Sequence, residues 1–220
     1  MRHIRGVILD VDGTLVDSND AQAQCWVEAM AEHGYSVAYE QVRRLIGKGG
    51  DKVLPEVIGI SKESDEGKQI SDRRGEIYKS RYLPSIKPTP GAKALLEEIR
   101  QRGLKLTVAS SAPPDELKAS LHIVGAEDLV EEASSSKDAK ESKPAPNIVE
   151  ATLKKMGYSA DEVVMIGDTP YDIESAQKIG IGTIAVRCGG WNDLELKGAI
   201  AIYDDPADLL AHYDSSPLAQ

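Results

Sequence analysis

Near its start the chain reads Ile4-Arg5-Gly6-Val7-Ile8-Leu9-Asp10-Val11-Asp12-Gly13-Thr14, an apolar run that leads directly into two aspartates. In an extended segment, residues two apart point to the same side, so the carboxylates of Asp10 and Asp12 converge and repel each other unless a cation or a shared proton intervenes. Gly13 permits a tight turn after the strand. An ordinary strand followed by an Asp/Gly turn would show the same pattern, so the rest of the chain has to decide between the two.

Short apolar runs recur along the chain, each bounded by glycine or polar residues and separated from the next by helix-length segments. They cover residues 4–10, 104–110, 162–167 and 182–186. Residues 91–102 carry Ala94, Leu95 and Ile99 at helical spacing, which predicts a helix that crosses from one strand to the next. This arrangement is typical of an α/β fold with a parallel sheet.

Residues 18–83 contain no convincing strand. They predict four helices, at Ala21–His33, Tyr39–Ile46, Asp51–Ile58 and Lys62–Leu83, which are separated by glycines. An ordinary connection has only about 2–6 residues. We therefore expect an inserted all-helical cap domain at residues 17–87, within a Rossmann-like parallel-sheet core formed by residues 1–16 and 88–220. The expected hinges are Leu15–Ser18 and the proline-rich stretch Pro84–Pro90.

Composition excludes several classes of protein. The 220 residues are 41% hydrophobic and 28% charged, and no apolar run approaches the roughly 20 residues that span a membrane. The net charge of -10 argues against nucleic acid or an anionic membrane as a partner. The start, Met1-Arg2-His3, does not resemble a secretion signal, so we expect a cytoplasmic protein. The two cysteines, Cys25 and Cys188, are far apart and are expected in the core without a disulfide.

Residues with chemically useful side chains follow each predicted strand. Ser110 and Ser111 come after the strand at 104–109, Lys143-Pro144 follows a polar loop at an expected helix start, and Gly167-Asp168-Thr169-Pro170-Tyr171-Asp172 follows Val163-Val164-Met165-Ile166. In open α/β sheets, ligands bind beyond the carboxyl ends of the strands. We therefore expect these residues to converge with Asp10 and Asp12.

These four segments, in this order, resemble the four motifs of the haloacid dehalogenase-like (HAD) hydrolase superfamily. A helical insertion between the first and second motifs is similar to the C1-capped subfamily, which includes phosphoglycolate phosphatases and β-phosphoglucomutases. The resemblance covers essentially the whole chain, and it implies an enzyme, a phosphoric monoester hydrolase that acts on a small phosphorylated metabolite. It leaves the oligomeric state unknown.

The resemblance also implies roles for individual residues. Asp10 would attack phosphorus and form an aspartyl-phosphate, and Asp12 would move protons to the leaving oxygen and from the attacking water. Mg²⁺ would be held by the Asp10 carboxylate, the Asp12 main-chain oxygen and Asp168. Asp172 would be a further metal ligand or a group that orients waters or Lys143, and we favour the second role.

The phosphoryl oxygens would be bound by Ser110, by Lys143, and by the segment around Gly13, Thr14 and Ser111. Each of these has an alternative. Ser110 could cap the following helix, Lys143 could be an ordinary solvated lysine, and Asp168 and Asp172 could form the acidic first turn of a helix.

Asp12 favours phosphate esters, because an alkoxide leaves only when protonated, whereas a halide needs no proton. Related dehalogenases lack this second carboxylate. The substrate would be recognised by the basic, glycine-rich segment of the cap, through Arg44, Lys48 and Lys52, although these could equally be surface cations. A phosphatase, a phosphomutase and a non-catalytic binding protein on the same scaffold remain open, and Thr14 resembles the phosphatases more than the mutases.

Overall fold

The computed structural model describes residues 3–219 and separates into two compact units. One unit contains residues 3–17 and 87–219 and holds the sheet, and the other contains residues 18–86 and is helical. The chain passes from one unit to the other after Asp17 and after Ile86. The sequence predicts these two boundaries one residue away, between residues 16 and 17 and between residues 87 and 88.

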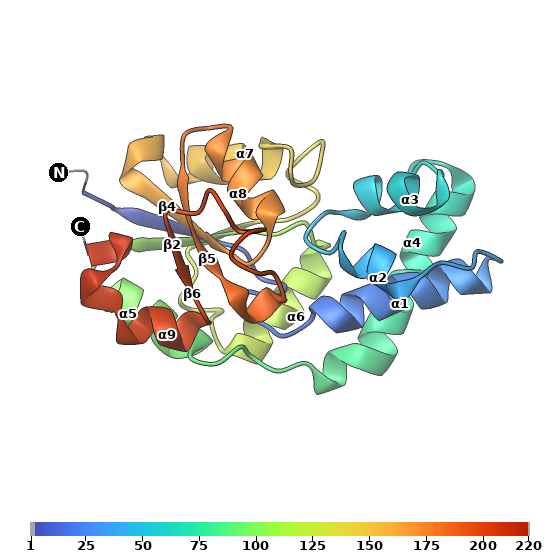
Figure 1. Ribbon diagram of the computed structural model, residues 1–220, viewed down its shortest axis with the longest axis horizontal. Coiled ribbons are helices and arrows are strands. Elements are labelled where there is room, and N and C mark those ends of the chain that lie inside the picture. The colour runs from blue at the N-terminus through green and yellow to red at the C-terminus, as the bar shows by residue number, and fades with distance from the viewer. Residues whose placement is uncertain (1–2, 220) are drawn as a thin grey trace. The chain divides into compact units, whose positions relative to one another are not determined.

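A parallel sheet of six strands forms the centre of the first unit among the described residues, in the order β3-β2-β1-β4-β5-β6 (Figure 1). This confirms the predicted Rossmann-like α/β fold. The strands are β1 Gly6–Leu9, β2 Lys105–Ala109, β3 Glu132–Ser134, β4 Val163–Gly167, β5 Gly182–Val186 and β6 Ala201–Tyr203.

Helices cover both faces of this sheet: α7 and α8 lie on one face, and α5 and α9 lie on the other (Figure 1). Leu95, Leu96 and Ile99 form the buried stripe of α5, at the spacing that one helix face requires. The helices of this unit are α5 Ala92–Gln101, α6 Pro114–Val124, α7 Asn147–Met156, α8 Pro170–Gln177 and α9 Pro206–Ala211.

Strand β1 lies at the point where the strand order reverses. Leu9, its last residue, pairs with Val108 of β2 on one side and with Ile166 of β4 on the other. In doubly wound sheets this switch point is where a ligand crevice forms, at the carboxyl ends of the strands. Asp10, the next residue, therefore emerges at the position where the fold offers a binding site.

The edge strands β3 and β6 were not predicted from the sequence. Each has only three residues, which is too short for a period of two to show. The segment at Lys143-Pro144 is also not a helix start, because α7 begins only at Asn147.

The helical unit contains α1 Asn19–Glu32, α2 Tyr39–Arg43, α3 Gly50–Ile58 and α4 Asp65–Ile77. Their shared core includes Trp26, Met30, Ile70, Ile77 and Tyr78.

Two of the helix predictions in this unit were wrong in extent. The predicted helix at Tyr39–Ile46 ends at Arg43. The predicted helix at Lys62–Leu83 starts only at Asp65, because the Ser64 hydroxyl accepts a hydrogen bond from the Gly67 amide at 3.0 Å and caps the helix there. Beyond Ile77 the chain continues as a π-helical turn, Tyr78–Tyr82, and a 3-10 turn, Leu83–Ser85.

The two segments that lead to and from the helical unit are hydrogen-bonded to each other. The Asp17 amide donates to the Lys87 carbonyl at 2.9 Å, and the Thr89 amide donates to the Leu15 carbonyl at 3.0 Å. Along residues 3–219, no helix is both long and apolar enough to span a bilayer.

Candidate active site

A buried lysine joins two of the predicted aspartates. The Lys143 ammonium donates to Asp10 Oδ1 and, at 2.7 Å, to Asp172 Oδ1. Lys143 and Asp172 are completely buried, and Asp10 is 4% exposed. Lysine is rarely buried unless it is paired, so this lysine is not the solvated surface residue of the alternative interpretation.

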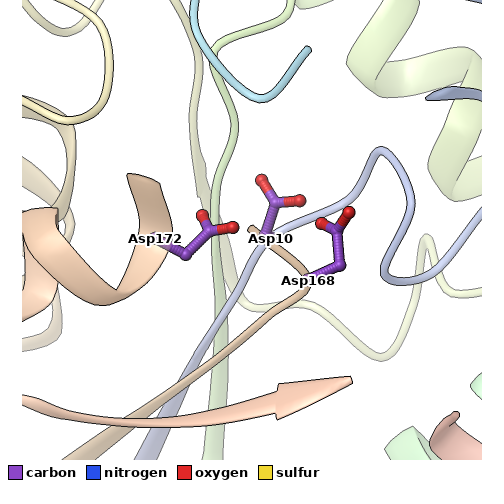
Figure 2. A group of neighbouring side chains, drawn as sticks. All are labelled: Asp10, Asp168 and Asp172. Atoms are coloured by element: carbon purple, nitrogen blue, oxygen red, sulfur yellow. The ribbon is translucent and has the colours of Figure 1, made fainter. Parts of the chain in front are cut away.

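A third aspartate lies on the other side of Asp10. Figure 2 shows Asp10 between Asp168 and Asp172, and carboxylate oxygens of the three residues lie within 4.8 Å of one another. The Thr14 hydroxyl lies 3.2 Å from Asp10 Oδ2 and 3.0 Å from Asp168 Oδ1, so it can donate to either carboxylate. The strand-end prediction therefore placed these groups together: Asp10 follows β1, and Asp168 follows β4.

Both oxygens of Asp172 are already engaged. Oδ1 accepts from Lys143, while Oδ2 accepts from the Thr169 amide at 3.0 Å and from the Thr169 hydroxyl at 2.7 Å. Thr169 and Asp172 thereby form a capping box at the start of α8. The local structure that fixes the helix start also fixes the carboxylate that orients Lys143.

Electrostatics set this group apart from ordinary ion pairs. Burial raises the pKa of the Asp10 carboxyl above its ordinary value, and the Lys143 ammonium opposes this rise. Burial alone would lower the pKa of Lys143, but the carboxylates of Asp10 and Asp172 raise it overall, so the lysine stays charged. Asp168 adds a third carboxyl group to this cluster, so acidic groups outnumber the one ammonium, and a divalent cation would offset the excess negative charge.

The loop between Asp10 and Val16 is closed by its own backbone. Gly13, with φ 77°, donates its amide to the Val16 carbonyl at 2.8 Å, and the Thr14 amide donates to the Val11 carbonyl at 3.2 Å. These two amides, which were candidates for phosphate binding, are thus hydrogen-bonded within the loop. Asp12 is half-buried on the same turn.

The segment after β5 also contacts this site, although the sequence analysis does not predict it. A Cβ atom at Gly189 would lie 1.7 Å from Asp168 Oδ2, so only glycine lets the backbone approach that carboxylate so closely. Cys188 is half-buried rather than in the core, unlike Cys25, which is buried as expected. Burial, and next the Asp168 carboxylate, raise the pKa of the Cys188 thiol to about 12. The strand-end rule, applied to β5, would have found this segment.

Ser110 lies directly after β2 and is 1% exposed. Its hydroxyl accepts a hydrogen bond from the Ala112 amide at 3.1 Å, and its own amide donates to the Ser134 carbonyl at 3.0 Å. It thus holds the turn that follows β2, while the helix-capping position of α6 belongs to Pro113. Ser111, beside it, is half-buried. The phosphate-binding roles of these two serines stay predictions.

The basic residues predicted to recognise the substrate belong to the helical unit. Lys48 donates to both carboxylate oxygens of Glu56 at 2.8 Å, and Arg44 is exposed. Their roles also stay predictions.

Comparison with known proteins places this site in a family. The model of the haloacid dehalogenase-like hydrolases matches residues 7–186, which includes Asp10, Lys143 and Asp168. The chain belongs to the haloacid dehalogenase-like hydrolases. This confirms the predicted family, and with it the prediction that the protein is an enzyme of the hydrolase class.

Similarity to individual known proteins extends over nearly the whole chain. A phosphoglycolate phosphatase of Rhodospirillum rubrum is 28% identical over 214 residues, which cover 93% of this chain and 89% of the relative. The crystal structure of a hydrolase from Pseudomonas syringae has a TM-score of 0.87 at 30% identity and covers 96% and 98% of the two chains. A putative β-phosphoglucomutase from Bacteroides vulgatus has a TM-score of 0.86 at 25% identity, with 97% and 88% covered.

Proposed function

We propose that this protein is a Mg²⁺-dependent phosphatase that hydrolyses a small phosphomonoester, of the phosphoglycolate or sugar phosphate type, through an aspartyl-phosphate intermediate. The observation that carries the proposal is the buried Asp10 carboxylate beyond β1, with the Lys143 ammonium on one oxygen and the Thr14 hydroxyl beside the other. A carboxylate held in this way is fixed in direction and shielded from water, which suits a nucleophile.

In the first step, an Asp10 oxygen attacks phosphorus in line with the leaving oxygen, and the P–O bond to the alcohol breaks. Asp12 gives its proton to that leaving oxygen. In the second step, water attacks the phosphorus of the acyl phosphate, and Asp12 takes a proton from the water. Phosphate and the Asp10 carboxylate are regenerated, so the protons balance over the cycle.

Lys143 supplies positive charge where negative charge develops on the transferring phosphoryl group. Asp172 holds the lysine from behind, because its Oδ1 accepts from the ammonium while its Oδ2 is fixed by Thr169. Asp172 therefore orients Lys143 in this proposal, and both of its oxygens are occupied without a metal.

The residues suit a divalent cation. Asp10, Asp168 and the main-chain oxygen of Asp12 offer the oxygen ligands that Mg²⁺ prefers, and the acidic group carries unbalanced negative charge. A bound Mg²⁺ would allow an anionic phosphate to approach an anionic nucleophile. Ser110 and Ser111 would donate to the phosphoryl oxygens, and Arg44, Lys48 and Lys52 of the helical unit, acting as a cap, would select the substrate.

The phosphoglycolate phosphatase from Rhodospirillum rubrum supports a small anionic phosphomonoester as substrate, since it matches this chain over most of both lengths. The similarity to the putative β-phosphoglucomutase from Bacteroides vulgatus supports a second candidate function, a phosphomutase. In that reaction the phosphoryl group is transferred back to a sugar hydroxyl rather than to water.

Turnover with Mg²⁺ and a panel of phosphomonoesters separates the two candidates. Release of inorganic phosphate from phosphoglycolate or a sugar phosphate is the expected result. Isomerised sugar phosphate without phosphate release would support the mutase instead. If no compound on the panel is converted in either way, the proposed function is wrong.

A further inference from the structure

Two carbonyl oxygens of the loop that follows Asp10 are held by side chains from distant parts of the chain. The Thr89 hydroxyl donates to the Thr14 carbonyl at 2.7 Å. The Cys188 thiol donates to the neighbouring Gly13 carbonyl at 3.2 Å. Both contacts lie within the sheet-containing unit. The peptide units at positions 13 and 14 are thus anchored by two side chains from different segments of the chain.

Thr89 is placed firmly for this contact. It is 4% exposed, its amide donates to the Leu15 carbonyl at 3.0 Å, and its carbonyl accepts from the Ala92 amide at 3.2 Å at the start of α5. Because this backbone is held at both its amide and its carbonyl, the buried Thr89 side chain keeps its hydroxyl directed at the Thr14 carbonyl. It therefore fixes the Thr14 carbonyl as well.

Cys188 contacts the loop from the segment that follows β5. Its neighbour Gly189 packs against the Asp168 carboxylate, so one short segment touches both Gly13 and Asp168. The thiol is a weak donor, and its raised pKa keeps its hydrogen in place at neutral pH. Of the two anchors, Thr89 makes the shorter and stronger bond.

These anchors act on the residue that lies between the two carboxylates. The Thr14 side chain is 3.2 Å from Asp10 Oδ2 and 3.0 Å from Asp168 Oδ1, and its direction depends on the peptide that Thr89 holds. A shift of the loop by a few tenths of an ångström would therefore change the distance from the Thr14 hydroxyl to each carboxylate. It would also move the main-chain oxygen of Asp12, two residues earlier.

We propose that Thr89 and Cys188 are positioning residues, which clamp the Gly13-Thr14 peptides and so set the spacing of Asp10, Asp12 and Asp168 around a divalent cation. This inference rests on the proposed function for its kinetic consequence. Its consequence for cation binding does not depend on which reaction the protein catalyses.

The test compares Thr89→Val, which keeps the shape of the side chain but removes the hydroxyl, with Thr89→Ser, which retains the hydroxyl. Thr89→Val is expected to lower kcat about fivefold, the factor that corresponds to one lost hydrogen bond of about 1 kcal/mol. KM for the phosphomonoester is expected to change by less than about twofold, because substrate contacts remain. In Thr89→Ser, kcat is expected to stay within about twofold of wild type.

A second readout does not depend on activity. The Mg²⁺ concentration that gives half of the full rise in Tm is expected to increase about fivefold in Thr89→Val and to return towards the wild-type value in Thr89→Ser. Cys188→Ala is expected to raise it about twofold, and Cys188→Ser, which keeps a donor, to raise it less. The double variant Thr89→Val/Cys188→Ala shows whether the two anchors act on the same loop.

Thr152→Val is the matched control. Thr152 is 1% exposed and donates to the Ile148 carbonyl at 2.7 Å within α7, so the same chemical change is made at the same bond length away from the loop. The control is expected to lower Tm without moving kcat or the Mg²⁺ midpoint.

The inference is wrong if Thr89→Val and Thr152→Val behave alike, or if Thr89→Ser fails to restore the Mg²⁺ midpoint. Should Thr89→Val not fold, an unchanged Mg²⁺ midpoint in Cys188→Ala would overturn the inference on its own. If the wild type converts no phosphomonoester, the proposed function fails, while the Mg²⁺ midpoints still decide the inference.

Discussion

Replacing Lys143 by methionine should affect stability and activity together. The lysine is completely buried, and its ammonium bonds to Asp10 and Asp172. Methionine fills similar space but leaves two buried carboxylates facing each other without a counter-charge. Breaking a buried ion pair in this way typically costs about 3–5 kcal/mol.

For a chain of 220 residues, each kcal/mol lowers Tm by about 2–4 °C, so Lys143→Met should lower Tm by roughly 10 °C. Loss of the charge that faces the phosphoryl group should lower kcat by about a hundredfold or more. Calorimetric unfolding gives the first quantity, and phosphate release under saturating substrate gives the second.

Lys155→Met is the control for burial. Lys155 also pairs with an aspartate, Asp138, at 2.8 Å, but its side chain is 36% exposed. An exposed pair contributes less than about 1 kcal/mol, so Tm should fall by only a few degrees and kcat should not change. If both variants lose the same small amount of stability, or if Lys143→Met keeps kcat within about threefold of wild type, the role assigned to Lys143 is refuted.

Three further perturbations test other parts of the account. Gly189→Ala should raise the Mg²⁺ concentration needed for half-maximal activity by about tenfold or more, because its Cβ would lie 1.7 Å from Asp168 Oδ2. In the control Gly182→Ala, the Cβ would meet only the Ile200 side chain at 3.1 Å, so this Mg²⁺ concentration should not change. Equal Mg²⁺ midpoints in the two variants would contradict the close packing of Gly189 against Asp168. Mg²⁺ at tenfold its dissociation constant should raise Tm by about 3–6 °C over the protein in EDTA, and an unchanged Tm would argue against a cation site. Hydrogen bonds to the Glu162 carboxylate, chiefly from Arg5 and next from Ser159, lower its pKa from 4.5 to about 2, so the stability that they add is present above about pH 4.5 and is lost as the pH falls towards 2. The difference in unfolding free energy between wild type and Glu162→Gln, measured with urea, should therefore shrink in that pH range. A difference that stays constant would count against this ion pair.

The centre of the fold was predictable because its strands are long enough to show a pattern. β1, β2, β4 and β5 are four or five residues each and are almost wholly buried, so they stand out as apolar runs. β3 and β6 have three residues each, and pairing with a neighbouring strand rather than local sequence makes them strands. The lengths of α2 and α4 depended on caps and turns, such as Ser64, that only the structure places.

The candidate active site also combines features that the sequence predicts with features that only the structure reveals. Asp10, Asp168 and Lys143 lie near strand ends or in a family motif, so their meeting could be inferred from the sequence. The sequence also favours Asp172 as the group that orients Lys143, whereas the hydrogen bonds by which Thr169 fixes its other oxygen follow from the structure. Thr89, Cys188 and Gly189 carry no motif of their own. Thr89 and Cys188 matter through the backbone carbonyls that they contact, and Gly189 matters through its close approach to the Asp168 carboxylate.

The most direct test of the central claim is the rate of phosphate release by Asp10→Asn relative to wild type, on the best substrate of the phosphomonoester panel with saturating Mg²⁺. The amide cannot attack phosphorus as the carboxylate does, so the account predicts a loss of at least about a thousandfold. A variant that folds normally and retains a rate within about tenfold of wild type would show that Asp10 is not the nucleophile.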